Sequence, residues 1–440
     1  MSSIRFHCDL LEKLGVSNFS RSNDRFKNIY MFCQYSAISF FVACHAWSTF
    51  TRATRYLPEF FQAFFEDLVT SFIVFFQIVY INYHSRQMME LASLMETEFC
   101  TSNNKVVRKY EARSKNMMVL ICLTVTLALA GTYCQTIFPL SSDEIEIRTN
   151  VYRTKHPARI PLSNIKIPFI DETESWYYEV IMVYQFYLAF YYTFGFTVVV
   201  TLIPNIIFFM KGQYTILCQH LERLGTQLRD SNGQRFVYRC LETDDIEYLP
   251  SVKKCQGICQ PNVRQICLKQ NKRIERKCEQ LYFRQILHLH QKLMKLQQKV
   301  QILFAPIVLP LVLCNNAAFS ICLYQLTDRN TNLSNARLFK FLIEFLTVAL
   351  QYFFLNNCSE MMDDCNTMVC RSIAFSHWQH CTRDTKRGLM SLLRVVQRPN
   401  HLKFYGGAII LSRVFFLHVV KIAYSFVNCM QMKSRRLEAD

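Results

Sequence analysis

The sequence predicts an all-α membrane protein with seven transmembrane helices. Hydrophobic residues make up 51% of its 440 residues, and aromatic residues alone make up 14%. They gather in runs that reach the roughly 20 residues a helix needs to cross a bilayer. Glycine is scarce, at 10 residues, whereas a soluble chain of this length would fold as two or three domains joined by glycine turns. These observations together favour a polytopic membrane protein.

Seven apolar runs mark the expected spans. They cover residues 29–50, 58–83, 116–140, 178–210, 300–326, 338–358 and 404–427. The second run is the least regular, because Glu66 and Asp67 interrupt it. Residues 1–28 contain no apolar run of the signal-peptide type, so we expect the first span to act as a signal anchor.

Lysine and arginine predict the orientation of the spans. The N-terminal tail and the segments after the second, fourth and sixth spans carry more than twice as many of them as the segments on the other side. Basic loops stay in the cytoplasm, so the N-terminus is expected inside and the C-terminus outside, the reverse of a G-protein-coupled receptor. Anionic lipid at the cytoplasmic face accounts for the net charge of +17 without a nucleic-acid partner.

The cytoplasmic segments are expected to extend the spans as helices. Leu217, Leu221, Leu224 and Leu228 recur at helical spacing after the fourth span. The amphipathic stretch TRDTKRGLMSLLRVVQ precedes the seventh span and ends near Pro399. We therefore expect these helices to pack together as an anchor domain.

Neither catalysis nor metal binding is expected from the motifs. Four cysteines share one cytoplasmic segment: Cys255, Cys259, Cys267 and Cys278. Their spacing is not that of the paired knuckles in zinc modules. Glycine-rich phosphate loops, HExxH and GxSxG are absent. We expect no enzyme, no cofactor and no metal.

The last span, within GGAIILSRVFFLHVVKIAYSFVN, holds three basic residues. At about 100° per residue, an arc of roughly 80° contains His418, Lys421, Ser425 and Asn428. Basic residues inside a membrane generally face water or protein and mark a functional pathway. A water-lined pathway is one interpretation, and a structural ion pair, for example of Lys421 with Glu344, is the other.

Aromatic residues in the outer halves of other spans suggest a cavity for a small hydrophobic ligand. The candidates are Phe61, Phe64, Phe65, Leu68 and Phe72 in the second span, Tyr133 and Ile137 in the third, and Tyr177, Tyr184 and Tyr187 at the start of the fourth. Each is also compatible with a belt of aromatic residues at the lipid interface. In a predicted exterior loop, the sequon at Asn332 is the expected glycosylation site.

Motifs in the last third of the chain resemble those of insect odorant receptors. HQKLMKLQQKVQILFAPIVL resembles the family's entry to the fifth span, and NCSEMMDDCNTMVCRSIAFSHW resembles the stretch that leads to Trp378. The closest match is LRVVQRPNHLKFYGG followed by VVKIAYSF, with Arg398-Pro399 and Gly406-Gly407 in the family's order. The arrangement of spans and cytoplasmic ends resembles the family over nearly the whole chain.

The resemblance implies a tetrameric, ligand-gated, non-selective cation channel in the plasma membrane of olfactory sensory dendrites. A small volatile odorant would bind in the outer half of spans 2 to 6. The cytoplasmic helices, including Trp378, would form the anchor between subunits. The seventh helix of each subunit would supply the pore and gate residues His418, Lys421, Ser425, Val427, Asn428 and Cys429.

This organisation divides the chain into seven parts. They are a cytoplasmic tail (1–28), spans 1–4 on the ligand side (29–210), a cytoplasmic extension with an insertion (211–299), spans 5–6 (300–358), cytoplasmic anchor helices (359–403), the pore-lining seventh span (404–428) and an extracellular tail (429–440).

The gate departs from the family pattern. It is usually aliphatic, but here it includes Asn428 and Cys429, which fits a tuning subunit in a heterotetramer with the shared odorant co-receptor. A gustatory-type channel is an alternative, although the Thr-Tyr ending of that family is here Ala423-Tyr424. A metabotropic seven-helix receptor is a third hypothesis, opposed by the charge pattern and by missing Asp-Arg-Tyr and Asn-Pro-x-x-Tyr motifs.

Overall fold

The protein is helical through most of the residues described by its computed structural model. These residues are 3–19, 25–55, 60, 62–99, 104–159, 161–163, 165–168, 170–226, 236–239, 246–248, 261–327 and 334–439. The α-helices are α1 (Ser3–Lys13), α2 (Arg25–Thr51), α4 (Thr70–Tyr83), α5 (Ser85–Thr97), α6 (Asn104–Ile137), α7 (Ser142–Asn150), α8 (Ser175–Glu222), α9 (Pro261–Thr327), α10 (Asn335–Phe375), α11 (Arg383–Val396) and α12 (Arg413–Ala439). Short elements complete the list: η1 (Ala53–Arg55), the π-helix η2 (Gln62–Val69), η4 (Trp378–His380), η5 (Tyr405–Gly407), and strands β1 (Phe236–Arg239), β2 (Ile246–Tyr248), β3 (Lys403–Phe404) and β4 (Ile409–Ile410).

The predicted all-α membrane fold is confirmed. Within the described residues, 6 helices are long and apolar enough to cross a membrane: α2, α6, α8, α9, α10 and α12. The π-helix η2 and the apolar α4 follow one another without a break and form the remaining span, the second along the chain. The π-helix contains Glu66 and Asp67, so the backbone departs from α-helical geometry where the apolar run is interrupted.

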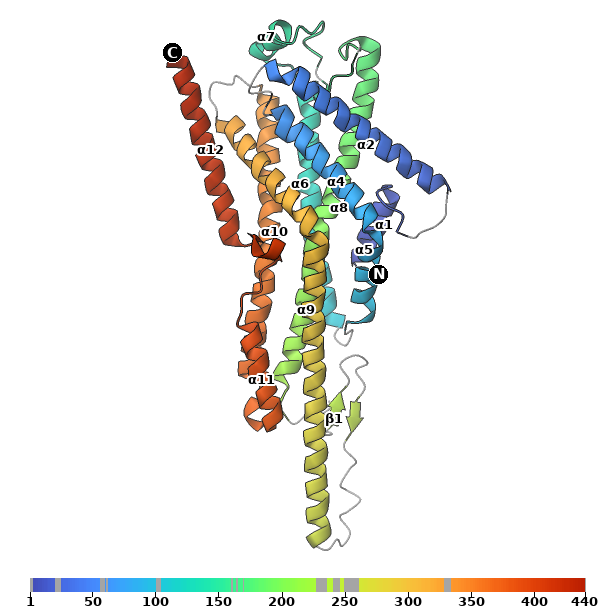
Figure 1. Cartoon of the computed structure of the whole chain (residues 1–440), viewed down its shortest axis with the longest axis vertical. Helices are drawn as coiled ribbons and strands as arrows, with labels where there is room; N and C mark the ends of the chain where they lie inside the picture. Colours follow the sequence, from blue (N-terminus) through green and yellow to red (C-terminus); the bar gives the residue numbers. More distant parts are fainter. Residues whose placement is uncertain are drawn as a thin grey trace.

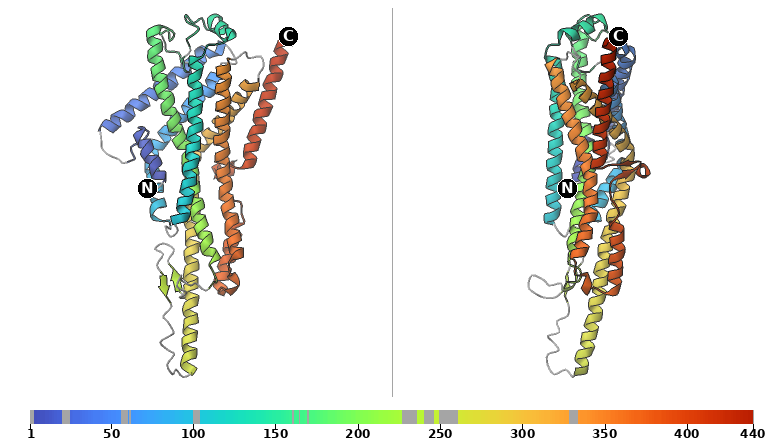
Figure 2. Two further views of the ribbon diagram at one scale, coloured as in Figure 1. Left: turned by 180° about the vertical axis from the view of Figure 1, so that it is seen from behind. Right: turned by 90° about the vertical axis from the view of Figure 1, so that its left-hand side faces the viewer.

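The helices form one elongated bundle (Figure 1, Figure 2). Helices α6, α8, α9 and α10 run along its long axis, whereas α2 and α4 cross it obliquely. We call the end with α7 and the C-terminus the upper end, and the end with α11 and the first turns of α9 the lower end. Helix α8 lies at the centre and is buried along most of its length from Thr197 to Leu221, while α12 stands at one side.

Helices α8 and α9 are far longer than a bilayer is thick. They have 48 and 67 residues, which correspond to roughly 72 and 100 Å of helix, against about 30 Å of hydrocarbon. Their lower parts share a core with α10 and α11 that includes Leu221, Leu293, Val369 and Leu389. The helical extensions predicted beyond the spans are therefore present and packed.

A row of polar side chains on α10 holds the segment that joins α11 to α12. We call Asn356, Ser359, Glu360, Asp363 and Asn366 the α10 row; their spacing places them on one face of the helix. Four backbone N–H groups donate to it: Asn400 to Asp363 Oδ1 (2.8 Å), Leu402 to Ser359 Oγ (2.7 Å), Ser412 to Asn356 Oδ1 (3.1 Å) and Arg413 to Glu360 Oε1 (2.8 Å). Three of these N–H groups lie outside any helix and that of Arg413 lies in the first turn of α12, so none has a partner within a helix and the row supplies the acceptors.

The last helix begins later than the sequence predicts. The seventh span is expected from residue 404, but α12 starts at Arg413. Between them, β3 pairs with β4 in a short antiparallel hairpin. Its turn holds Tyr405, Gly406 and Gly407 at φ values of 51°, 67° and 101°, a region that glycine enters readily and that ends a helical run. The Gly-Gly pair is thus explained by the turn.

Replacing one acceptor of the α10 row tests how much the row contributes to the stability of the protein. Ser359→Ala leaves the buried N–H of Leu402 without an acceptor, so we expect the free energy of unfolding to fall by about 1–3 kcal/mol. Ser391→Ala is the control, because the Ser391 hydroxyl is exposed and bonds only within α11. Thermal unfolding of the detergent-solubilised protein measures both. Equal melting temperatures would contradict the role of the row.

Candidate functional site

Helix α12 presents its predicted polar arc to the outside of the bundle. It packs against α9 and α10 with one narrow stripe, in which Val419, Ala423 and Val427 are 3%, 0% and 3% exposed. The residues of the arc are all exposed: His418, Lys421, Ser425 and Asn428. The basic side chains of the arc therefore face the surroundings of the single chain and not its core.

The residues of the predicted gate lie on two different faces of α12. Val427 is buried against the bundle, whereas Asn428 and Cys429 are exposed. The alternative pairing of Lys421 with Glu344 does not form. Glu344 Oε1 lies 3.7 Å from Lys340 Nζ on its own helix, and Lys421 makes no ion pair with any residue that the structure describes.

Three of the aromatic ligand candidates join α8 to a neighbouring helix. The Tyr184 hydroxyl donates to the carbonyl oxygen of Ala37 on α2 (2.5 Å). The Tyr133 hydroxyl donates to the carbonyl oxygen of Phe186 on α8 (3.3 Å), and the two rings stack at 4.4 Å. The Tyr187 hydroxyl accepts a hydrogen bond from Gln34. These tyrosines join helices with their hydroxyl groups and leave ring surface for apolar contacts.

The other ligand candidates are less enclosed. Three of them face outward: Phe72, Ile137 and Tyr177, which are 55%, 77% and 41% exposed. Phe64 and Leu68 are half-buried, and Phe64 stacks on Phe60 at a centroid distance of 5.7 Å. Phe61 and the side chain of Phe65 lie outside the described residues. Tyr184 and Tyr187 thus contact α2, Tyr133 contacts Phe186 of α8 from α6, and the structure does not gather the predicted set at one place.

One face of α2 contributes polar residues that sequence analysis did not select. Gln34, Phe41, His45 and Ser48 are buried, and their spacing of seven, four and three residues places them on one stripe of the helix. His45 Nε2 lies 3.1 Å from Ser163 Oγ. The stripe is visible in the sequence and could have been found there, because polar residues at core spacing within an apolar helix need partners.

The segment between α6 and α8, residues 138–174, covers the upper end of the bundle and is called here the capping loop (Figure 1). Arg52 forms a mostly buried ion pair with Glu172, and its guanidinium lies 4.9 Å from the ring centre of Tyr152. Arg337 Nη1 lies 2.8 Å from Glu144 Oε1 in a second such pair. The loop is thus tied to α10 and to the residue that follows α2.

Exposed charges add a third tie within the capping loop. Lys155 Nζ lies 2.8 Å from Glu174 Oε1 and 3.7 Å from Asp171 Oδ2. The hydrogen bond to Glu174 raises the pKa of Lys155. Burial opposes ionisation of Asp171, but hydrogen bonds from Thr173 and the charge of Lys155 outweigh it, so its pKa lies below the usual value. Both groups stay charged at neutral pH.

Most of the sequence matches the model of a known protein family. The sequence matches the family model described as 7tm Odorant receptor over residues 57–424. The chain belongs to the odorant receptor family. No curated protein is similar enough to this odorant receptor in sequence to count as a match.

Two solved structures share the fold of this odorant receptor. One is the insect olfactory receptor OR5 from Machilis hrabei, with a TM-score of 0.67 and 13% identity over 97% of each chain. The other is OR5 from Machilis hrabei in complex with eugenol, with a TM-score of 0.64 and 13% identity over 98% of this chain and 97% of that chain. At this identity the likeness concerns the fold alone.

Trp378 of the odorant receptor lies at the lower end of the bundle, in the turn η4 between α10 and α11. It is 44% exposed. The neighbouring His377 donates its backbone N–H to the carbonyl oxygen of Leu224 (3.1 Å), so the turn is fixed to the end of α8 while the indole remains accessible. The glycosylation candidate Asn332 lies outside the described residues.

Breaking a buried ion pair tests how the capping loop is held. Arg52→Met leaves Glu172 charged and only 7% exposed, so we expect a loss of roughly 3 kcal/mol in stability and faster proteolysis between residues 142 and 159. Arg86→Met is the control, because the Arg86–Glu90 pair is 72% and 63% exposed and such pairs contribute about 0.5 kcal/mol or less. Equal proteolysis rates for both variants would refute this account of the loop.

Proposed function

We propose that this odorant receptor is a subunit of an odorant-gated, non-selective cation channel. The observation that carries the proposal is the outward polar arc of α12. A charged side chain at the centre of a bilayer costs about 2.5–3.5 kcal/mol on insertion scales and more for an isolated helix. Lys421 therefore needs water or a partner chain beside it, since none of the described residues of its own chain pairs with it.

A ring of four α12 helices supplies that environment. In it His418, Lys421 and Ser425 face a water-filled pore, and Asn428 and Cys429 surround its narrow upper end, while Val427 packs behind them against the bundle. Hydrophobic constrictions gate by excluding water, and exposed Asn428 weakens such a constriction. We therefore assign this chain to a heterotetramer with the shared odorant co-receptor, which contributes the tighter gate.

The ligand in this proposal is a small, volatile, mostly apolar molecule. The fold likeness to OR5, of which one structure is a complex with eugenol, supports this class. The binding surface is formed by the second span, α6 and the upper part of α8, with Phe61, Phe64, Phe65, Leu68, Phe72, Tyr133, Ile137, Tyr177, Tyr184 and Tyr187 as its residues. Apolar surface with a few hydroxyl groups is typical of pockets for such ligands.

The orientation follows from charge. The basic extensions at the lower end lie in the cytoplasm, near anionic lipid, and the capping loop and C-terminus lie outside. The receptor then occupies the plasma membrane of olfactory dendrites, with the accessible Trp378 among the contacts between subunits. In this arrangement Asn332 is exterior and open to glycosylation, whereas Asn18 is not.

Whole-cell current during a panel of volatiles, with and without the co-receptor and with G-protein signalling blocked, tests the function. We expect fast cation current only with the co-receptor. Current without it would favour a self-sufficient channel of the gustatory type. Loss of the response under G-protein block would favour a metabotropic receptor and reject the channel.

Removing the charge of the polar arc tests the pore. Lys421→Gln should raise the single-channel Na⁺ conductance of the heteromer roughly two-fold, because a fixed positive charge beside the path raises the barrier for cations. Arg413→Gln is the matched control: it removes the same charge, but Arg413 lies beyond the arc and its guanidinium donates to Asn357. Identical conductance in Lys421→Gln and the unmodified channel would place Lys421 away from the pore.

Substitutions on α8 test the ligand surface. Tyr184→Leu should raise the half-maximal odorant concentration about ten-fold or more, since it removes ring contacts and the hydroxyl that joins α2 to α8. Val183→Ala changes the adjacent residue, which is 71% exposed, and should leave that concentration within about two-fold. Concentration–response curves of the heteromer measure both values. Equal shifts of the half-maximal concentration in the two variants would exclude Tyr184 from the site.

A further inference from the structure

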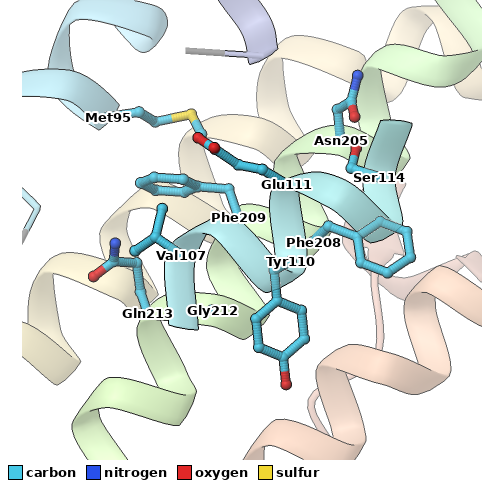
Figure 3. Close-up of a pocket in the computed structure, with 10 residues that line it drawn as sticks. All are labelled: Met95, Val107, Tyr110, Glu111, Ser114, Asn205, Phe208, Phe209, Gly212 and Gln213. Atoms are coloured by element: carbon cyan, nitrogen blue, oxygen red, sulfur yellow. The ribbon is translucent and has the colours of Figure 1, made fainter. Parts of the chain in front are cut away.

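A cavity lies between α5, α6 and α8, away from the proposed odorant surface (Figure 3). Its interior volume is about 50 Å³, well below the roughly 300–1,000 Å³ of pockets that enclose a whole small molecule. The interior therefore has room for a small head group, and the rest of a larger ligand would lie at the mouth. Met95, Phe208 and Phe209 contribute apolar surface to its walls.

Two buried polar atoms of this cavity have no partner among the described residues. Ser114 is 2% exposed and Asn205 is 3% exposed, yet Ser114 Oγ and Asn205 Oδ1 make no hydrogen bond. The amide nitrogen of Asn205 lies 2.7 Å from His7 Nε2, which leaves the oxygen as the end available to the cavity. The two side chains lie next to each other in Figure 3. Buried polar atoms without partners are costly, so this pair points to a ligand that donates hydrogen bonds.

The charged residue that lines the cavity indicates which kind of hydrogen-bond donor the cavity binds. Glu111 lies one helical turn before Ser114 on α6 and lines the same cavity. It forms no ion pair with a described residue, and no lysine, arginine or histidine is among the lining residues. The Tyr110 hydroxyl turns away from the cavity in Figure 3 and accepts a hydrogen bond from Thr215. The cavity thus offers a carboxylate, two oxygens that accept hydrogen bonds, and aromatic rings, and these are the groups that a cation prefers as neighbours.

We propose that this cavity binds a primary ammonium group attached to an apolar body. The ammonium donates to Ser114 and Asn205, the carboxylate of Glu111 on the same cavity wall supplies the opposite charge, and the apolar part packs on Phe208 and Phe209. Two of the three N–H groups of the ammonium match the two acceptors that lack partners. A soluble alkylamine and the head of an ethanolamine lipid both carry this group, and with the lower end in the cytoplasm either can reach the cavity from the inner side of the membrane.

Photolabelling of the full chain in lipid nanodiscs tests the proposal. The probe is octylamine bearing a diazirine, and labelled peptides are mapped by mass spectrometry. We expect label on residues 95–114 and 205–213, displaced by excess octylamine but not by octanol, which lacks the charge. Label confined to other segments, or equal displacement by octanol, would overturn the proposal. The assay needs no channel current, so its result is independent of the proposed odorant function.

Variants and lipid composition complete the test. Glu111→Gln removes the charge at nearly constant volume and should weaken octylamine binding about ten-fold. Glu90→Gln, an exposed carboxylate on α5, should leave it unchanged. Unaltered binding in Glu111→Gln would overturn the proposal. Replacing phosphatidylcholine with phosphatidylethanolamine distinguishes the sources: reduced labelling identifies the lipid head as occupant, and equal labelling identifies the soluble amine.

Discussion

Backbone N–H groups that have no partner within a helix or strand must find acceptors elsewhere, and in this receptor one helix supplies them for the segment that carries α12. The α10 row accepts four such N–H groups between Asn400 and Arg413. Asn366 accepts a fifth bond, from the side-chain amide of Asn400, which in turn accepts from Gln297 of α9. Helices α9 and α10 thereby fix the position from which α12 begins, and the direction in which its polar arc faces follows from that.

Polar groups in the spans are arranged in two ways. Those of α2 and α8 turn inward and bind the capping loop, as His45 binds Ser163 and Gln185 binds the backbone of the same residue. Those of the polar arc on α12, from His418 to Asn428, turn outward and make no hydrogen bond or ion pair with a described residue. Lipid offers polar groups no hydrogen-bond partners. The inward groups find their partners within one chain, whereas the outward arc needs water or further subunits.

The fold was largely predictable, because hydropathy and charge act locally along the chain. Six predicted spans coincide with described helices of membrane length, and the second coincides with η2 and the shorter α4. The helical extensions and the polar arc of α12 were also predicted in this way. The hairpin before α12 was missed, since an apolar run shows membrane length but not the left-handed turn at Gly406-Gly407. The burial of Val427 and the cavity beside Ser114 and Asn205 depend on which helices are neighbours, and one sequence does not contain that information.

Helices α6, α8 and α10 connect the proposed ligand surface to the proposed pore. Tyr133 and Tyr184 stand on α6 and α8, and α10 packs along both of these helices; the hydroxyl of Thr347 on α10 donates to the Thr124 carbonyl oxygen of α6 (3.2 Å). In the proposed channel, a ligand that moved α6 against α8 would displace α10, since close-packed helices shift as units and not side chain by side chain. The α10 row would then transmit that displacement to the start of α12, because the hydrogen bonds that position α12 are made by α10 itself.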